Sequence, residues 1–181
     1  MNLTGITEYE EVIQKHFLDS LSLIRVIPDI ASQKLTVIDL GTGAGFPGIP
    51  LKIAFPELEI TLMDSLNKRI LFLQEVIDAL GLKKVSAVHG RAEEMASNAT
   101  HRQQYDLCVS RAVSNLAVLT EYCLPFVKKG GLFVSYKSAD SDAEIQEGKK
   151  AISILGGKLT SVDKFQLPDS DLRRALVCIK K

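Results

Sequence analysis

Short apolar runs alternate with amphipathic or polar stretches along most of the 181-residue chain. Five of these runs are rich in valine, isoleucine and leucine, which is typical of strands buried on both faces of a sheet. They lie at residues 35–40, 58–64, 85–90, 105–111 and 130–137. Helical patterns separate them, and strands that alternate with helices predict an α/β fold with a mostly parallel sheet.

The clearest helical pattern runs over residues 66–80, where apolar side chains recur at steps of three and four. Gly81 follows as a left-handed cap. The same spacing over residues 9–24 predicts an amphipathic opening helix that needs a surface to pack on. Thr7 and Glu10 match a capping box for this first helix.

The pattern changes toward the end of the chain. Ser141 and Glu144 match a second capping box and predict the start of another helix. The last two apolar runs, at 158–167 and 173–181, are separated by only a few residues, which is too short for the crossover helix of a parallel pair. They predict an antiparallel hairpin at or near the sheet edge, and so a seven-stranded sheet.

Composition predicts one domain over residues 1–181, with residues 1–30 as a helical segment that packs on it, because 46% of the residues are hydrophobic. The start of the chain lacks the pattern of a signal peptide, and no run has the roughly 20 apolar residues of a membrane span. Three cysteines in apolar settings read as reduced core residues. We therefore expect a cytoplasmic protein without a membrane partner.

Charge limits the partners that the chain can attract. Twenty-two basic residues balance 22 acidic ones, so no global field recruits nucleic acid, and a polyanion would have to meet a local basic patch. The three histidines share no metal-ligand spacing, so we expect no metal site.

Residues 37–51 read VIDLGTGAGFPGIPL and carry the strongest chemical signal. Gly41, Gly43 and Gly45 come directly after the first predicted strand, where doubly wound sheets bind their ligands. Glycine at this place lets the backbone approach a ligand closely, and Pro47 is suited to the first turn of the next helix.

Two ligand classes use such a loop. Residues 43–48 match the G-x-G-x-x-G fingerprint of dinucleotide binding, whereas Asp39 before Gly41 completes the D-x-G-x-G-x-G pattern of S-adenosylmethionine binding, which we favour. Asp64 ends the second predicted strand, the usual place for an acid that accepts hydrogen bonds from ribose hydroxyls. The pattern itself predicts cofactor contacts at Gly41, Gly43, Gly45 and Asp64.

Several blocks in order along nearly the whole chain resemble one family. They are NLTGI at 2–6, HFLDSL at 16–21, DLGTGAGFPGIPL at 39–51, GRAEE at 90–94, SRAV at 110–113 and YK at 136–137. The resemblance is to the RsmG (GidB) family of bacterial 16S ribosomal RNA guanine-N7 methyltransferases. Its members normally carry a helical segment before NLT, where this chain starts, so we expect a short or N-terminally truncated member.

The resemblance implies a class I, Rossmann-like methyltransferase that uses S-adenosylmethionine. It implies cofactor contacts at Gly41 and Phe46, at Ala92 and Glu93, and at Arg111. It also implies transfer of a methyl group to nitrogen 7 of a guanine in 16S ribosomal RNA, with the small ribosomal subunit as partner.

The residues fit this chemistry. Guanine nitrogen 7 carries a lone pair and no proton, so we expect no catalytic general base. Residues 110–115, SRAVSN, replace the Asn-Pro-Pro-Tyr type motif of many amine methyltransferases, and Cys108 lies inside an apolar run where it cannot attack a pyrimidine. Arg111 and Lys137 end neighbouring strands and are predicted to contact RNA.

Other interpretations stay open from the sequence alone. A methyltransferase for a small molecule or protein would bind the same cofactor without RNA. An NAD-dependent oxidoreductase would bind NAD instead, and a non-catalytic scaffold would bind cofactor without turnover. On the opening helix, His16, Asp19 and Ser20 are predicted to form a half-buried polar cluster that braces the cofactor loop.

Overall fold

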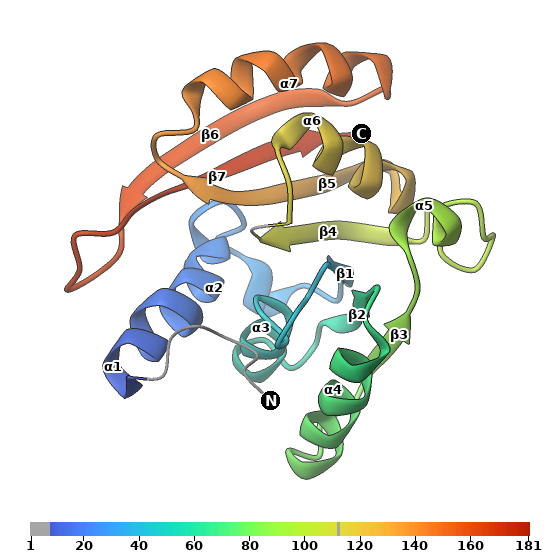
Figure 1. The fold of residues 1–181 in the computed structure, drawn as a ribbon, viewed down its shortest axis with the longest axis vertical. Coiled ribbons are helices and arrows are strands. Elements are labelled where there is room, and N and C mark those ends of the chain that lie inside the picture. Colours follow the sequence, from blue (N-terminus) through green and yellow to red (C-terminus); the bar gives the residue numbers. More distant parts are fainter. Residues whose placement is uncertain (1–7, 112) are drawn as a thin grey trace.

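The computed structural model describes residues 8–111 and 113–181, and seven strands within them form one sheet in the order β3-β2-β1-β4-β5-β7-β6 (Figure 1). The strands are β1 (Thr36–Leu40), β2 (Glu59–Asp64), β3 (Val85–His89), β4 (Tyr105–Arg111), β5 (Val127–Ser138), β6 (Lys158–Gln166) and β7 (Arg173–Lys180). The first five pair in parallel, and β7 pairs antiparallel with both β5 and β6. The predicted sheet and its terminal hairpin are confirmed.

The strands are apolar on both faces because each face packs against helices. In β1, the neighbouring residues Val37 and Ile38 point to opposite faces, and both are fully buried. Val37 belongs to a core cluster with the N-terminal helices, α3 (Gly48–Ala54) and α4 (Asn67–Ala79). Ile38 belongs to a cluster with α6 (Leu116–Cys123) and α7 (Asp142–Ile154). This two-sided burial is the physical reason for the continuous apolar runs in the sequence.

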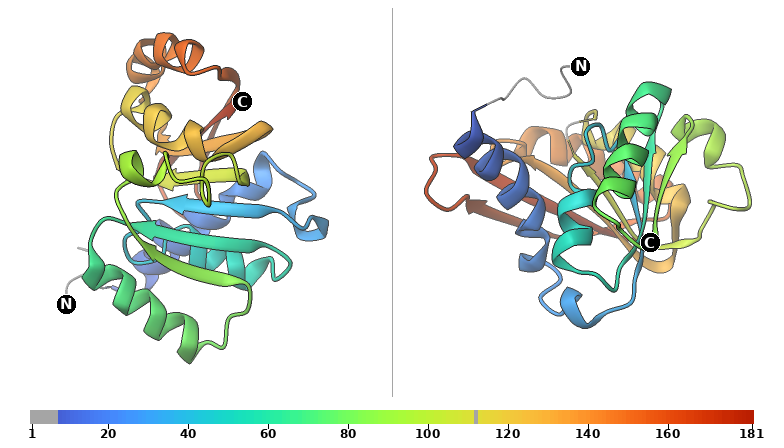
Figure 2. Two further views of the ribbon diagram at one scale, coloured as in Figure 1. Left: turned by 90° about the vertical axis from the view of Figure 1, so that its right-hand side faces the viewer. Right: turned by 90° about the horizontal axis from the view of Figure 1, so that it is seen from below.

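The chain forms these helical elements in order. They are α1 (Tyr9–Val12), η1 (Ile13–Leu18), α2 (Asp19–Leu21), η2 (Ser22–Arg25), η3 (Ile30–Ser32), α3 (Gly48–Ala54), α4 (Asn67–Ala79), α5 (Ala92–Met95), α6 (Leu116–Cys123), η4 (Leu124–Phe126) and α7 (Asp142–Ile154). Residues 9–32, here called the N-terminal segment, lie beside α3 and the β6–β7 hairpin (Figure 2).

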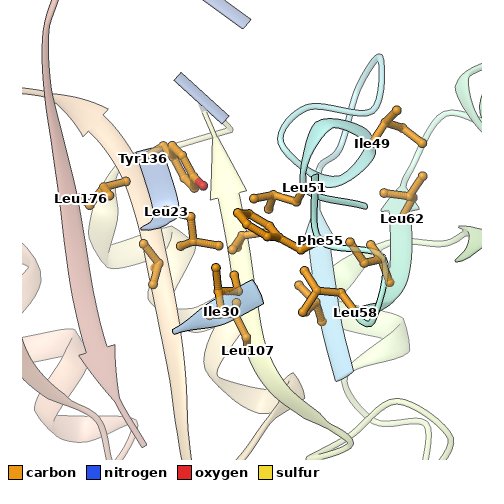
Figure 3. Close-up of a cluster of buried hydrophobic side chains, with 14 of the residues drawn as sticks. Leu23, Ile30, Ile49, Leu51, Phe55, Leu58, Leu62, Leu107, Tyr136 and Leu176 are labelled. Carbon is orange, nitrogen blue, oxygen red and sulfur yellow. The ribbon is translucent and has the colours of Figure 1, made fainter. Parts of the chain in front are cut away.

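The N-terminal segment is part of the core. Leu23 and Ile30 are fully buried and meet Leu51 of α3 and Phe55 directly after it over the sheet (Figure 3). The hydroxyl of Tyr136 on β5 donates a 2.9 Å hydrogen bond to the carbonyl oxygen of Ser20. The amphipathic pattern of the segment thus reflects a real packing partner.

Local details of two predicted helices differ from expectation. The segment over residues 9–24 is not one regular α-helix, because Ile13–Leu18 is a π-helix and Ser22–Arg25 a 3-10 helix. The helix after the glycine loop starts at Gly48, so Pro47 is its N-cap rather than its first residue. The capping box at Thr7 and Glu10 lies outside the residues and side chains that the structure describes.

The second predicted capping box is wrong, although its helix is present as α7. Ser141 occupies the N-cap position, but its hydroxyl donates to the carbonyl oxygen of Ser138 at 2.8 Å instead of capping the helix. Glu144 pairs with Lys137 at 2.6 Å. A tertiary ion pair therefore takes the carboxylate that a capping box needs.

Three further observations concern residues 8–111 and 113–181. The thiols of Cys108, Cys123 and Cys178 are free and buried, as expected of core cysteines. No helix there is both long enough and apolar enough to cross a membrane. No group of three histidine, cysteine or carboxylate side chains gathers there as a set of metal ligands.

Candidate active site

The loop after β1 needs glycine where its backbone is left-handed and crowded. Gly41 and Gly43 have φ angles of 72° and 61°, which side chains with a Cβ atom rarely adopt. A Cβ atom on Gly41 would clash with a methyl group of Val113, whereas no described atom lies within 4 Å of a Cβ on Gly43. The absence of a side chain on Gly41 leaves room for Val113, and Gly43 exposes its backbone to open space.

Asp39 connects the two ends of this glycine loop through hydrogen bonds. Its Oδ2 accepts hydrogen bonds from the hydroxyl of Thr42 at 2.6 Å and from the backbone N–H of Gly48 at 2.8 Å. The side chain is fully buried, and this burial raises the pKa of Asp39 to about 6. One carboxyl group thus joins the start of the loop to the start of α3.

Asp64 supports the same loop from the end of β2. Its carboxylate accepts hydrogen bonds from the backbone N–H of Gly43 at 3.0 Å and of Leu66 at 2.9 Å. Arg69 forms an ion pair with it at 3.1 Å. These contacts fix the carboxylate at the edge where β1 and β2 end, and its predicted bonds to ribose hydroxyls stay a prediction.

A cleft of about 270 Å³, here called the glycine cleft, opens above the ends of β1, β2 and β3. It is lined by Leu40, Gly41, Met63, Asp64, Ser65, Gly90, Arg91, Ala92, Glu93, Val113 and Tyr122. Parallel strands end at the same edge of a sheet, so three separate loops meet here. The structure thereby brings together Gly41, Asp64, Ala92 and Glu93 from the sequence prediction.

The other predicted cofactor contacts lie around this cleft rather than in its lining. Gly43 joins the loop to Asp64. Gly45 is buried, and its N–H donates to the carbonyl oxygen of Thr42 at 2.9 Å. Phe46 and Arg111 face the N-terminal segment.

Arg111 anchors the N-terminal segment to the end of β4. One terminal nitrogen donates to the carbonyl oxygen of Lys15 at 2.9 Å and to the carboxylate of Asp19 at 3.0 Å. The other donates to Nδ1 of His16 at 2.9 Å. The guanidinium therefore holds the N-terminal segment against the end of β4 through three hydrogen bonds.

Phe46 connects the contacts of Arg111 and His16 to the glycine loop. Its ring stacks on the imidazole of His16 at a centroid distance of 4.9 Å, and the guanidinium of Arg111 lies 5.4 Å from its centre. Burial, followed by the charge of Arg111, lowers the pKa of His16. The neutral ring accepts at Nδ1, so its proton is on Nε2. This geometry agrees with the predicted bracing of the loop.

A second cavity of about 370 Å³, here called the arginine cavity, lies at the ends of β4 and β5 beside the N-terminal segment. It is lined by Lys15, His16, Asp19, Arg111, Tyr136, Lys137, Ser138 and Arg174. The ammonium of Lys137 donates to the carbonyl oxygen of Ser114 at 2.6 Å and pairs with Glu144 at 2.6 Å. Both residues predicted to contact RNA thus line one cavity, although Lys137 is held by protein groups.

Some lining residues were not predicted from the sequence. Tyr122 of α6 closes one side of the glycine cleft, and the carboxylate of Glu93 beside it raises the pKa of its phenol. Arg174 stands near the start of β7. The place of Arg174 could have been predicted, because an antiparallel last strand begins at the edge where the parallel strands end. No comparable signal marked Tyr122.

Comparison with known protein families decides between the chemical alternatives. The GidB family, described as rRNA small subunit methyltransferase G, matches residues 1–175. The chain belongs to the GidB family. Membership makes it a methyltransferase, and it decides against the oxidoreductase that the fingerprint at residues 43–48 also allowed.

Individual GidB relatives cover the whole chain. The ribosomal RNA small subunit methyltransferase G of Lachnoclostridium phytofermentans is 60% identical over all 181 residues, which span 74% of that relative. The protein of the same name from Alkaliphilus metalliredigens is 56% identical, again over the full chain and 75% of the relative. Both matches span every element that lines the two cavities.

Solved structures support the fold. A SAM-dependent methyltransferase from Aquifex aeolicus superposes with a TM-score of 0.66 at 15% identity, covering 94% of this chain and 93% of that one. At this identity the likeness concerns the fold alone. The GidB chain therefore has the Rossmann-like methyltransferase architecture that the family resemblance implied.

Proposed function

We propose that this GidB protein transfers a methyl group from S-adenosylmethionine to nitrogen 7 of a guanine in 16S ribosomal RNA, within the small subunit in the cytoplasm. The observation that carries the proposal is the pair of neighbouring cavities at one sheet edge. The glycine cleft has the backbone and carboxylate of a nucleoside-cofactor site, and the arginine cavity has the cations that suit a polyanion.

The glycine cleft fits the cofactor. Gly41 brings bare backbone into its lining, and Asp64 and Glu93 supply carboxylates that can accept bonds from hydroxyl and amino groups. Ala92 offers a small apolar wall. When bound, S-adenosylmethionine supplies an electrophilic methyl group on a sulfonium.

The protein's own part in the reaction is to position the guanine and keep water away. Aligning two reactants and excluding solvent can supply much of a rate enhancement. Nitrogen 7 needs no deprotonation, so a site without a paired acid and base suffices. Arg111 orders the N-terminal segment over Phe46, and we propose that it and Lys137 face the incoming RNA.

The experiment combines binding with turnover. The purified protein is titrated with S-adenosylhomocysteine and, separately, with NADH, and tritiated methyl transfer is then measured on small subunits that lack the modification. We expect binding of the first ligand and labelling of one guanine, located by borohydride and aniline cleavage at the 7-methylguanine. Labelling of another base would contradict the proposed target, and binding of NADH alone would contradict the cofactor.

A further inference from the structure

The arginine cavity has more positive charge than its acidic lining balances. Four of its eight lining residues are lysine or arginine, and Asp19 is the one carboxylate among them. Arg111 and Arg174 both pair with that carboxylate, at 3.0 Å and 3.3 Å. One negative charge therefore serves two guanidinium groups.

The other cations of the cavity are engaged with protein groups. Lys15 pairs with Glu11 at 2.7 Å, and Lys137 pairs with Glu144 at 2.6 Å. Arg111 makes three hydrogen bonds with the N-terminal segment. Arg174 differs, because only its Nε meets Asp19 and its terminal nitrogens form no hydrogen bond within residues 8–111 and 113–181.

The sheet directs Arg174 into the cavity. In the antiparallel pairing of β5 with β7, Arg174 is opposite Ser138, two residues beyond the pair Tyr136 and Leu176. Side chains two apart share a face, so Arg174 points toward the same side as Tyr136, where the N-terminal segment packs. Its fork lies at the edge where the parallel strands end, beside the proposed methyl-transfer site.

We propose that Arg174 binds a backbone phosphate of the RNA strand that carries the target guanine. The inference rests on the proposed function. A guanidinium fork matches two phosphate oxygens and forms charge-assisted bonds with both. The same fork on guanine O6 and nitrogen 7 would occupy the atom to be methylated, so a phosphate is the partner that the reaction permits.

The test compares Arg174→Gln with Arg25→Gln. Arg25 also joins the N-terminal segment to the hairpin, through a 2.6 Å ion pair with Asp163, but it lies outside the cavity lining. Steady-state methylation of small subunits is measured at several salt concentrations, together with the affinity for S-adenosylhomocysteine. Arg25→Gln therefore controls for loss of a fastening contact without loss of the cavity cation.

We expect Arg174→Gln to raise KM for small subunits about tenfold, with kcat and S-adenosylhomocysteine affinity close to those of the unsubstituted protein. Loss of one phosphate contact should also reduce the slope of log KM against log salt by about 0.7–0.9. Arg25→Gln should leave KM and slope unchanged, and Arg174→Lys should restore the slope but only part of the KM.

Three results would overturn the inference. Equal changes in Arg174→Gln and Arg25→Gln would show that Arg174 only fastens the segment. If Arg174→Gln lowers S-adenosylhomocysteine affinity and leaves the salt slope unchanged, Arg174 acts on cofactor binding rather than on RNA. If the unsubstituted protein labels no small-subunit RNA, the proposed function fails and this inference fails with it, a result distinct from the first two.

Discussion

Asp39 shows how one buried carboxyl group can shape a ligand loop. Replacing Asp39 by alanine leaves the hydroxyl of Thr42 and the N–H of Gly48 without their acceptor. We expect Asp39→Ala to lower the free energy of unfolding by about 1–3 kcal/mol and to weaken S-adenosylhomocysteine binding. Urea unfolding and ligand titration measure the two effects.

Asp39→Asn is the matched control, because its amide oxygen can still accept both bonds without a titrating carboxyl group. Its loop should bind S-adenosylhomocysteine better than that of Asp39→Ala. Equal binding by the alanine variant and the unsubstituted protein would refute the loop-closing role of Asp39.

Gly41 provides a second residue-scale prediction. Gly41→Ala puts a methyl group against Val113 at a left-handed backbone position, so we expect weaker S-adenosylhomocysteine binding. Adding Val113→Ala should recover the part that is due to the clash and leave the part that is due to backbone strain. A double-mutant cycle by calorimetric titration measures this coupling. Additive effects of the two changes would mean that the clash is relieved by other movements.

Replacing Lys137 distinguishes two roles of this residue, contact with RNA and support of Ser114. We propose that Lys137 faces the RNA. Lys137→Ala should therefore reduce turnover on small subunits and leave S-adenosylhomocysteine affinity unchanged. Both quantities are measured on the same preparation. A loss of S-adenosylhomocysteine affinity would instead indicate that the main task of Lys137 is to hold Ser114, next to Val113 of the glycine cleft.

At the scale of elements, the N-terminal segment depends on contacts made far away in sequence. Its helices are short and include a π-helix, and helices of this length are marginal alone in water. Arg111 reaches it from 96 residues away, and Tyr136 from 116 residues away. The N-terminal segment is therefore held in place by side chains of the strand ends that also line the arginine cavity.

The contact of His16 with Arg111 makes this element sensitive to pH. Because the pKa of His16 in the folded protein is lowered from its ordinary value of 6.5, the contact adds stability above pH 6.5. That stability is lost as pH falls through the folded-state pKa. Protonation would place a second positive charge beside the guanidinium of Arg111 and remove the acceptor at Nδ1.

We therefore expect the stability advantage of the unsubstituted protein over His16→Gln to be largest above pH 6.5 and to shrink under more acidic conditions. Urea unfolding of both proteins across pH 5–8 measures the difference, in which the opposing titration of Asp39 cancels because both proteins contain it. A constant difference across this range would show that His16 acts by packing alone.

The sequence predicted the elements better than their ends. The apolar runs that became the parallel strands are explicit, and the short link between β6 and β7 excludes a crossover. The π-helix at Ile13–Leu18 contacts Arg111, and the failed capping box at Ser141 loses its Glu144 carboxylate to an ion pair with Lys137. Local patterns do not contain such partners.

For the whole molecule, zero net charge and a polyanionic substrate are compatible. The chain balances its charges globally, yet the fold gathers Lys15, Arg111, Lys137 and Arg174 around one cavity. These residues come from four parts of the chain that are separate in sequence, namely the N-terminal segment, β4, β5 and β7. The glycine loop could be recognised from a contiguous pattern, whereas the arginine cavity arises only when the hairpin and the N-terminal segment meet.

The strand order has a consequence for the growing polypeptide. Because β7 lies between β5 and β6, β6 has no partner in the sheet until β7 has been synthesised. Until then β5 is an open edge with unpaired backbone groups, the kind of edge to which other chains can add. During translation, chaperone protection of this edge should matter most in the interval between the emergence of β5 and that of β7.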